Sequence, residues 1–201
     1  MLSRLFDGDK MKTHLWNSFK MLLVMTVFTG LVYPLVMTAI AQIVFPNQAN
    51  GSMIRINGKL VGSKLIGQNF TSDRYFWPRP SAIGYNPLPS GGSNYGPTSD
   101  TLKKLVEMRR REFIRLNGLP ANTNVPPDML YASGSGLDPD ISPESAELQI
   151  DRVARARDFD SLQTAALRKL VKSHIEKPQL GFLGDSRVNV LELNIALDSL
   201  R

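Results

Sequence analysis

The chain has 201 residues, a formal net charge of +6, no cysteine and only two histidines, His14 and His174. This composition excludes a disulfide scaffold, thiol catalysis, thiolate metal sites and multi-histidine zinc sites. The overall share of 42% hydrophobic residues is unevenly distributed, because 19 of the 25 residues from 21 to 45 are apolar. The chain therefore consists of one lipid-like segment and one polar segment.

Residues 21–45 predict a single transmembrane helix, preceded by an N-terminal tail over residues 1–20. Positions 21–54 contain no charged residue, and 21 residues of helix span about 31 Å, which matches a bilayer core. A cleaved signal peptide is the alternative, because Ala39-Ile40-Ala41 resembles a cleavage site. The apolar run before that site is longer than signal peptides usually have, which favours a retained helix.

Small and polar residues recur at every fourth position of this helix and form a ridge: Thr26, Gly30, Pro34, Thr38 and Gln42. Small residues at this spacing let a second helix approach closely, and threonine or glutamine can donate hydrogen bonds across the contact. We therefore predict partner-helix packing along this ridge. Pro34 removes one backbone hydrogen bond, so we expect a kink near Gly30.

The distribution of charge around the span favours an N-terminus inside and a soluble domain outside. Four basic residues precede the span and three follow it closely, which is a small excess on the N-terminal side. The span itself has no ionisable residue, which excludes a proton relay of its own.

Residues 46–201 predict one mixed α+β soluble domain. Asn57-Gly58 between short apolar runs predicts a tight hairpin, and the apolar run 65–70 is expected to extend its second strand. Residues 73–97 contain five prolines, which excludes a helix or a central strand. The aromatic residues in this stretch indicate an ordered, packed loop.

Three helices are predicted after this loop. A capping residue among Thr98–Asp100 and a stop at Gly118 bound the first. Ser142 caps the second, whose inward residues are Ala146, Ile150, Val153 and Ala154. The third covers 161–174, with a predicted core face of Leu162, Ala165, Ala166, Leu170 and Val171.

The C-terminal segment 187–200 has two readings. The alternation of Val188 and Val190 is typical of a strand, whereas a capping box from Asn189 to Glu192 and the leucine spacing favour a helix. We expect the helix.

Several local patterns resemble functional motifs without completing them. Residues 90–97 form a glycine-rich turn before a helix, which suggests an anion cradle, but the Walker lysine is missing. Asp138-x-Asp140-x-Ser142 imitates the start of a calcium loop but lacks its glycine and its final glutamate. A glycine turn and proline turns explain both patterns better.

A membrane-tethered serine–lysine hydrolase is the enzymatic alternative. Ser133 and Ser135 lie in a glycine-rich loop, yet no lysine is placed beside them by the sequence. Arg109–Arg111 are candidates for binding phosphate or anionic lipid, but a solvated helix face explains them more simply. With 20 basic and 16 acidic residues, the segment 46–201 is too balanced to indicate a nucleic-acid partner.

Longer strings resemble the C subunit family of the bacterial Kdp potassium-transporting ATPase. They are Gly62–Phe70, Tyr75–Ser81, Tyr85-Asn86, Ser90–Asn94, Gly96–Ser99, Ser133–Pro143, Gln149, Arg152–Ala154, Ala156-Arg157 and Arg187–Asn194. The order and length of these strings make the resemblance specific. One departure is Gly134, where the family usually has alanine.

The resemblance implies a non-catalytic accessory subunit of a high-affinity, ATP-driven potassium uptake complex in the bacterial inner membrane. The implied partners are a potassium-channel-like subunit and a P-type ATPase subunit, together with the membrane. No intrinsic cofactor is expected. The resemblance also implies assistance to ATP binding by the ATPase subunit, with Gln149 as the residue concerned. That role conflicts with a domain outside the membrane, so an assembly clamp or an outer cover near the potassium entrance is the preferred interpretation.

Overall fold

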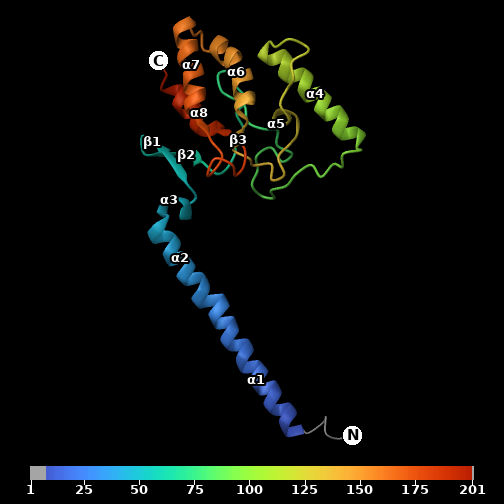
Figure 1. Cartoon of the computed structure of the whole chain (residues 1–201), viewed down its shortest axis with the longest axis vertical. Helices are drawn as coiled ribbons and strands as arrows, with labels where there is room; N and C mark the ends of the chain where they lie inside the picture. Colours follow the sequence, from blue (N-terminus) through green and yellow to red (C-terminus); the bar gives the residue numbers. More distant parts are fainter. Residues whose placement is uncertain (1–7, 201) are drawn as a thin grey trace. The chain divides into compact units, whose positions relative to one another are not determined.

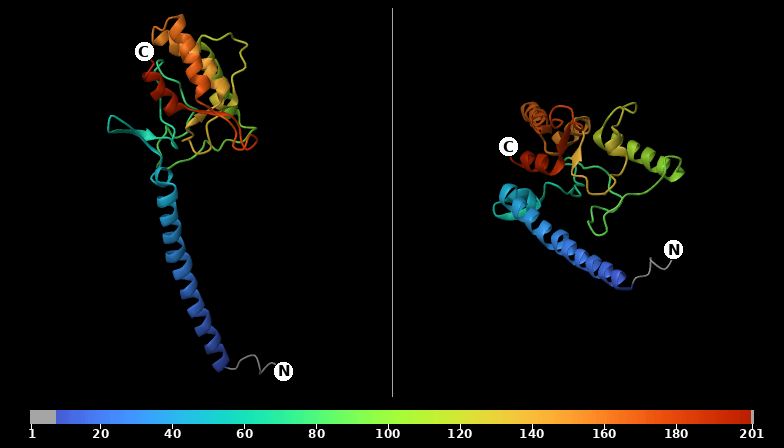
Figure 2. Two further views of the ribbon diagram at one scale, coloured as in Figure 1. Left: turned by 60° about the vertical axis from the view of Figure 1, so that its left-hand side comes forward. Right: turned by 60° about the horizontal axis from the view of Figure 1, so that its bottom comes forward.

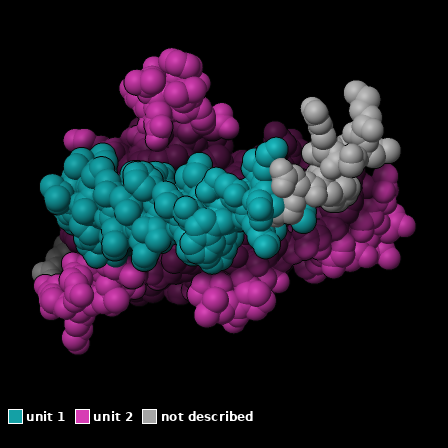
Figure 3. Space-filling view, turned by 90° about the horizontal axis from the view of Figure 1, so that it is seen from below, with its two compact units in different colours: residues 1–52 teal, residues 53–201 magenta. Residues whose placement is uncertain are grey.

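The computed structural model describes residues 8–200 and divides into two compact units, one ending at Ser52 and one beginning at Met53. Figure 3 colours these units separately. The first unit is helical, and the second combines helices with two small sheets. The predicted architecture of an N-terminal apolar helix and an α+β domain is therefore confirmed.

The first unit is one helical rod followed by a short turn of helix (Figures 1 and 2). It consists of α1 (Gly8–Val27), the π-helical segment η2 (Phe28–Val32), α2 (Tyr33–Val44) and α3 (Pro46–Ala49). The stretch Asp9–Val44, 36 residues long, is apolar enough to cross a membrane. The helix starts well before residue 21, because no proline or glycine interrupts residues 9–29. Residues 8–20 therefore belong to the same helix as the apolar residues that follow.

The helix departs from regular α geometry where the sequence predicts a disturbance. Pro34 has no N–H to donate to the carbonyl of Gly30, four residues earlier. Directly before it, the N–H of Tyr33 bonds to the carbonyl of Phe28, which is a π-type bond. The rod accommodates the proline by one wide turn over residues 28–32.

The second unit opens with the predicted hairpin of β1 (Met53–Ile56) and β2 (Lys59–Ser63). Asn57 and Gly58 at its tip have φ values of +50° and +77°, as a type I′ turn requires. The expected extension over residues 65–70 is wrong. The chain turns away at Gly67, whose N–H bonds to the carbonyl of Leu137 at 2.7 Å. An added Cβ at Gly67 would lie 2.5 Å from the Asp138 carbonyl oxygen, so this close approach requires glycine.

Five helices follow the hairpin: α4 (Asp100–Asn117), α5 (Pro127–Leu130), α6 (Pro143–Ala156), α7 (Ser161–Ser173) and α8 (Val190–Asp198). The predicted caps are confirmed, since Ser99, Ser142 and Asn189 each accept a backbone N–H of the first turn. Gly118 ends α4 with a left-handed φ of +68°. Helix α6 packs against α7 and α4, and α7 packs against α8 (Figure 1).

A three-stranded antiparallel sheet of order β3-β5-β4 lies among these helices. Its strands are β3 (Asp140–Ile141), β4 (Ile175–Glu176) and β5 (Arg187–Asn189). The prediction did not include β3 or β4, because two residues are too short for an alternation of hydrophobicity. Segment 187–200 forms a short strand, β5, followed by helix α8, so the strand and the helix interpretations each hold for one part of it.

The core of the second unit is formed mainly by α6, α7, α8 and the chain segments that cross them. The predicted inward face of α6 is confirmed, with Ile150 and Val153 at most 1% exposed. The predicted core face of α7 is partly wrong. Leu162 is 78% exposed, whereas Leu167, which was not expected, is fully buried beside Val171. Leu167 and Val171 are four residues apart and therefore lie on the same face of the helix. The capping box formed by Asp160 and Gln163 fixes where α7 begins.

A cluster of ion pairs joins the segment after β2 to the sheet and to α8. The ammonium of Lys64 lies 2.9 Å from carboxylate oxygens of both Glu176 and Glu192. Arg187 contacts Glu176 at 2.9 Å and Asp140 at 3.2 Å. The hydrogen bond from Lys64 holds the pKa of Glu176 below its usual value. Burial instead raises the pKa of Asp140.

The lowered pKa of Glu176 makes its contribution to stability depend on pH. A depressed carboxyl pKa stabilises the fold above the unfolded-state pKa, and this contribution is lost as the pH falls through the folded-state pKa. We expect Glu176→Gln to lower the free energy of unfolding by about 0.5–1 kcal/mol at neutral pH, since the pair is partly exposed. The difference from wild type should shrink toward zero in acid, measured by thermal unfolding of the full chain in detergent. Glu147→Gln, at an exposed position, is the control; a difference independent of pH would contradict the prediction.

Candidate functional site

Two buried amide side chains bind the backbone of consecutive loop residues, Phe76 and Trp77. Asn194 on α8 accepts the N–H of Phe76 at 2.8 Å and donates to its carbonyl at 3.0 Å. Gln149 on α6 accepts the N–H of Trp77 at 2.7 Å and donates to its carbonyl at 3.2 Å. Each amide therefore forms the two backbone hydrogen bonds that a neighbouring strand would form with this segment, which belongs to no sheet.

Arg152, one turn after Gln149 on α6, is the centre of this network. Its side chain is 3% exposed, and its Nη groups donate to the carbonyls of Asp73 (2.7 Å) and Tyr75 (3.0 Å). A further Nη2 bond of 2.8 Å reaches the Gln149 side-chain oxygen. The guanidinium also stacks on the ring of Trp77, with 3.5 Å between its carbon and the ring centroid. Burial lowers the pKa of Arg152 to about 10, so the group stays charged at neutral pH.

The same network reaches the end of α4 and the end of α8. Arg152 Nε donates to the Asn117 side-chain oxygen at 2.9 Å, which connects α6 to the last residue of α4. Arg157 donates to the carbonyl of Arg74 at 2.8 Å and contacts Asp198 at 2.6 Å. The loop that begins near residue 73 is therefore held by side chains of α6 and α8, and α4 joins the network through Arg152.

The predicted nucleotide residue Gln149 lies in this network. Gln149 is fully buried, and its side-chain nitrogen also donates to the carbonyl of Ser145 at 3.2 Å. All of its polar atoms thus bond within the domain. In this conformation a ligand reaches Gln149 only if the segment at Trp77 moves away.

The ridge residues of the membrane helix are exposed along the first unit. Thr26, Gly30, Pro34 and Thr38 are all exposed, and apart from the adjacent residues and the nearby helix backbone no described atom lies within 4 Å of a Cβ placed on Gly30. Gln42 differs, because its side-chain oxygen accepts a hydrogen bond of 3.1 Å from Asn50. The predicted packing surface is therefore open in this chain, except that Gln42 also ties α2 to the turn after α3.

The remaining candidate residues have structural partners. Ser133 is 5% exposed, Ser135 Oγ accepts the N–H of Leu137, and no hydrogen bond joins either serine to a lysine within residues 8–200. Asp138, from the calcium-like pattern, pairs with Arg79 at 2.6 Å. The described residues therefore provide no serine–lysine pair for the hydrolase alternative. In the calcium-like pattern, the carboxylate of Asp138 is already engaged in an ion pair within the domain.

Comparison with known proteins identifies the family. The family model described as K+-transporting ATPase, c chain (KdpC) matches residues 15–199. The chain belongs to this family. The potassium-transporting ATPase KdpC subunit of Geobacter sulfurreducens is 52% identical over 90% of this chain and 94% of its own length. The KdpC subunits of Mycobacterium bovis and Methylococcus capsulatus are 47% and 50% identical, over 94% and 95% of this chain and all of each relative.

The resemblance inferred from the sequence strings is thereby confirmed, and the structure brings several of these strings together. Tyr75–Ser81 lies against Gln149, Arg152 and Asn194, which come from three other strings. A sequence signal for this was present, because Gln149 and Arg152 interrupt the apolar stripe of Ala146, Ile150 and Val153. Polar residues on a buried helix face need internal partners, but the sequence alone did not identify the partner segment.

The network predicts a large cost for a conservative change at Arg152. Lysine keeps the charge but cannot donate to four oxygens or stack as a plane, so buried carbonyls lose their partners. We expect Arg152→Lys to lower the free energy of unfolding by about 1–3 kcal/mol and to change Trp77 fluorescence, measured by denaturation of the full chain in detergent. The control is Arg168→Lys, whose partly exposed pair with Asp151 should change stability by less than about 0.5 kcal/mol. Equal effects of the two variants would contradict the assigned role.

Proposed function

We propose that the chain is a non-catalytic accessory subunit that supports assembly of a potassium-transporting ATPase complex in the bacterial inner membrane. Membership of the KdpC family supports an accessory role in potassium transport. The observation that carries the assembly role is the open ridge of Thr26, Gly30, Pro34 and Thr38 on an uncharged span. The proposed partners are the potassium-channel-like subunit and the P-type ATPase subunit of that complex.

The wide turn of η2 supports this use of the ridge. Residues four apart on an α-helix drift by about 40° per step around the axis, because each residue turns by about 100°. A turn with π-type bonds holds an additional residue and therefore winds less per residue. Placed between Thr26 and Pro34, it offsets part of this drift and keeps small residues closer to one line, where a partner helix can pack.

The polar groups of the second unit support a binding role instead of catalysis. Gln149, Arg152 and Asn194 hold the chain's own backbone, and the sequence lacks the Asp-Lys-Thr-Gly-Thr phosphorylation motif of P-type ATPases. We place the domain outside the membrane, as an assembly clamp or a cover near the potassium entrance. Promotion of ATP binding through Gln149 stays a prediction, and it requires both a domain inside and an opened loop.

The assembly role is tested on the ridge. Gly30→Leu adds a branched side chain where a partner backbone is expected to approach, so we expect the subunit to be lost from the complex on affinity purification and potassium uptake at low external potassium to fall. Val32→Leu, which places the same side chain on the other side of the helix, should retain both co-purification and uptake. If Gly30→Leu co-purifies as wild type does and supports normal uptake, the ridge is not a docking surface.

The orientation is tested separately with a tag after Arg201. If the domain is outside, protease added to intact spheroplasts should remove the tag, while a tag before Met1 should be protected. The converse pattern would contradict the proposed orientation. It would also bring the domain to the side where ATP is present, and Gln149→Ala should then weaken ATP binding by the complex.

A further inference from the structure

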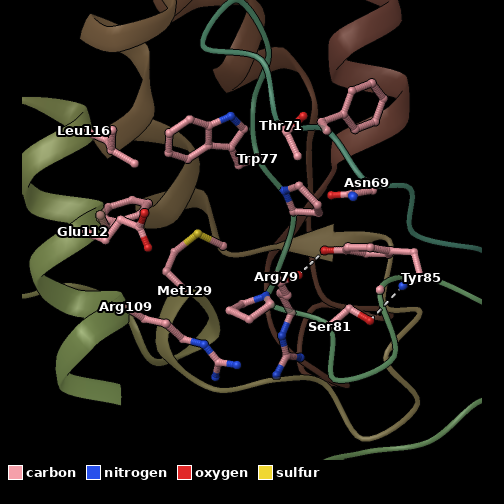
Figure 4. Close-up of a pocket in the computed structure, with 15 residues that line it drawn as sticks. Asn69, Thr71, Trp77, Arg79, Ser81, Tyr85, Arg109, Glu112, Leu116 and Met129 are labelled. Atoms are coloured by element: carbon pink, nitrogen blue, oxygen red, sulfur yellow. Dashed lines mark hydrogen bonds between the residues drawn. The ribbon is translucent and has the colours of Figure 1, made fainter. Parts of the chain in front are cut away.

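A cleft of about 510 Å³ lies within the second unit between α4 and the loop that the Arg152 network holds. One wall is a face of α4 that includes Arg109, Glu112 and Leu116, and the other includes Trp77–Ser81 (Figure 4). This volume falls in the range of small-molecule sites in proteins. The function proposed above does not use it.

The two ends of the cleft differ in chemistry. In Figure 4 the guanidinium groups of Arg79 and Arg109 lie at one end, beyond Met129. Trp77, Thr71 and Leu116 lie at the opposite end. An occupant that suits both ends has an apolar body and an anionic head.

Arg109 is a partly buried cation, and no carboxylate pairs with it in the part of the chain that the structure describes. Its Nη1 donates to the carbonyl of Leu130 at 2.8 Å, and within residues 8–200 no acidic group lies at ion-pair distance from it. Its neighbours Arg110 and Arg111 both pair with Glu107 instead. Burial lowers the pKa of Arg109, which reflects the cost of keeping this charge away from water. An anion in the cleft would reduce this cost.

Arg79 provides a second, independent indication. Its Nη1 pairs with Asp138 at 2.6 Å, yet its Nε is buried and has no hydrogen-bond partner in the described part of the chain. A buried donor without an acceptor is unfavourable and calls for an explanation. The Arg79 carbonyl accepts the hydroxyl of Tyr85, which fixes the backbone that presents this side chain to the cleft.

We propose that this cleft binds an organic oxyanion, a carboxylate or phosphate joined to an apolar group, with its head at Arg79 and Arg109 and its body against Trp77 and Leu116. Arginine forms strong, charge-assisted hydrogen bonds with both kinds of oxyanion. Glu112 is the acidic residue of the lining, and it opposes a ligand of high negative charge. The site therefore suits a singly or doubly charged head.

Trp77 makes binding measurable, because the chain has only two tryptophans and Trp16→Phe leaves Trp77 alone. The full chain is placed in nanodiscs of zwitterionic lipid and titrated with hexanoate and with phenyl phosphate. We expect a saturable change in Trp77 emission with at least one of them. Inorganic phosphate should bind at least about tenfold more weakly, because it lacks the apolar body.

Variants on α4 separate binding from folding. Arg109→Gln should weaken binding by about tenfold, as expected for loss of a hydrogen bond from a charged donor. Glu112→Gln, at an exposed position, should tighten binding, a gain that misfolding cannot produce. Arg111→Gln, whose side chain is 77% exposed and faces away from the cleft lining, should leave affinity unchanged.

The source of the oxyanion is resolved by changing the lipid. The head group belongs to a lipid if nanodiscs of anionic phospholipid shift Trp77 emission without added probe and Arg109→Gln abolishes this shift. If no such shift occurs, the head group belongs to a free molecule. The proposal is overturned if neither probe nor anionic lipid gives a saturable change. It is also overturned if Arg109→Gln binds as wild type does, or if inorganic phosphate binds as well as the probes. None of these readouts depends on potassium uptake or on assembly.

Discussion

Backbone groups that are buried outside helices and sheets need side-chain partners, and in the segment from Asp73 to Trp77 these partners are Gln149, Arg152 and Asn194. Pro78 and Pro80 follow this segment directly and disfavour a central strand, and within residues 8–200 no strand pairs with it. One arginine and two amides take that place. Because they come from α6 and α8, the conformation of the loop depends on the packing of these helices, and the loop in turn forms the wall that faces α4.

This dependence explains how the polar residues of the domain are used. In an enzyme, buried titratable groups are commonly aimed at a substrate. Here the most deeply buried cation, Arg152, is aimed at the carbonyls of its own chain and at the ring of Trp77. The ion pairs around Lys64 likewise connect strands and helices of the same domain. Such an interior builds a rigid surface on an irregular backbone, which suits a subunit that binds other proteins.

The sequence predicted those features that depend on neighbouring residues. Caps at Ser99, Ser142 and Asn189, the turn at Asn57-Gly58 and the long apolar helix are all local signals, and all are present. The two-residue strands, the buried face of α7 and the turn at Gly67 depend on contacts between segments far apart in the chain. The resemblance directed attention to Gln149 but could not tell a ligand contact from a backbone contact. That distinction required knowing that Trp77 lies beside it, 72 positions earlier in the chain.

Structural groups and candidate binding groups of the domain differ in whether their hydrogen bonds are complete. Gln149 was the predicted ligand residue, yet every polar atom it has is used within the domain, so its burial is explained by the fold alone. Arg79 and Arg109 show the opposite pattern on one cleft: among residues 8–200 the buried Nε of Arg79 has no acceptor, and the partly buried Arg109 has no counter-ion. An external anion in the cleft would supply the missing acceptor to the one group and a counter-charge to the other. The Arg152 network also contributes to this cleft, because it holds Trp77 and so keeps one wall of the cleft in place.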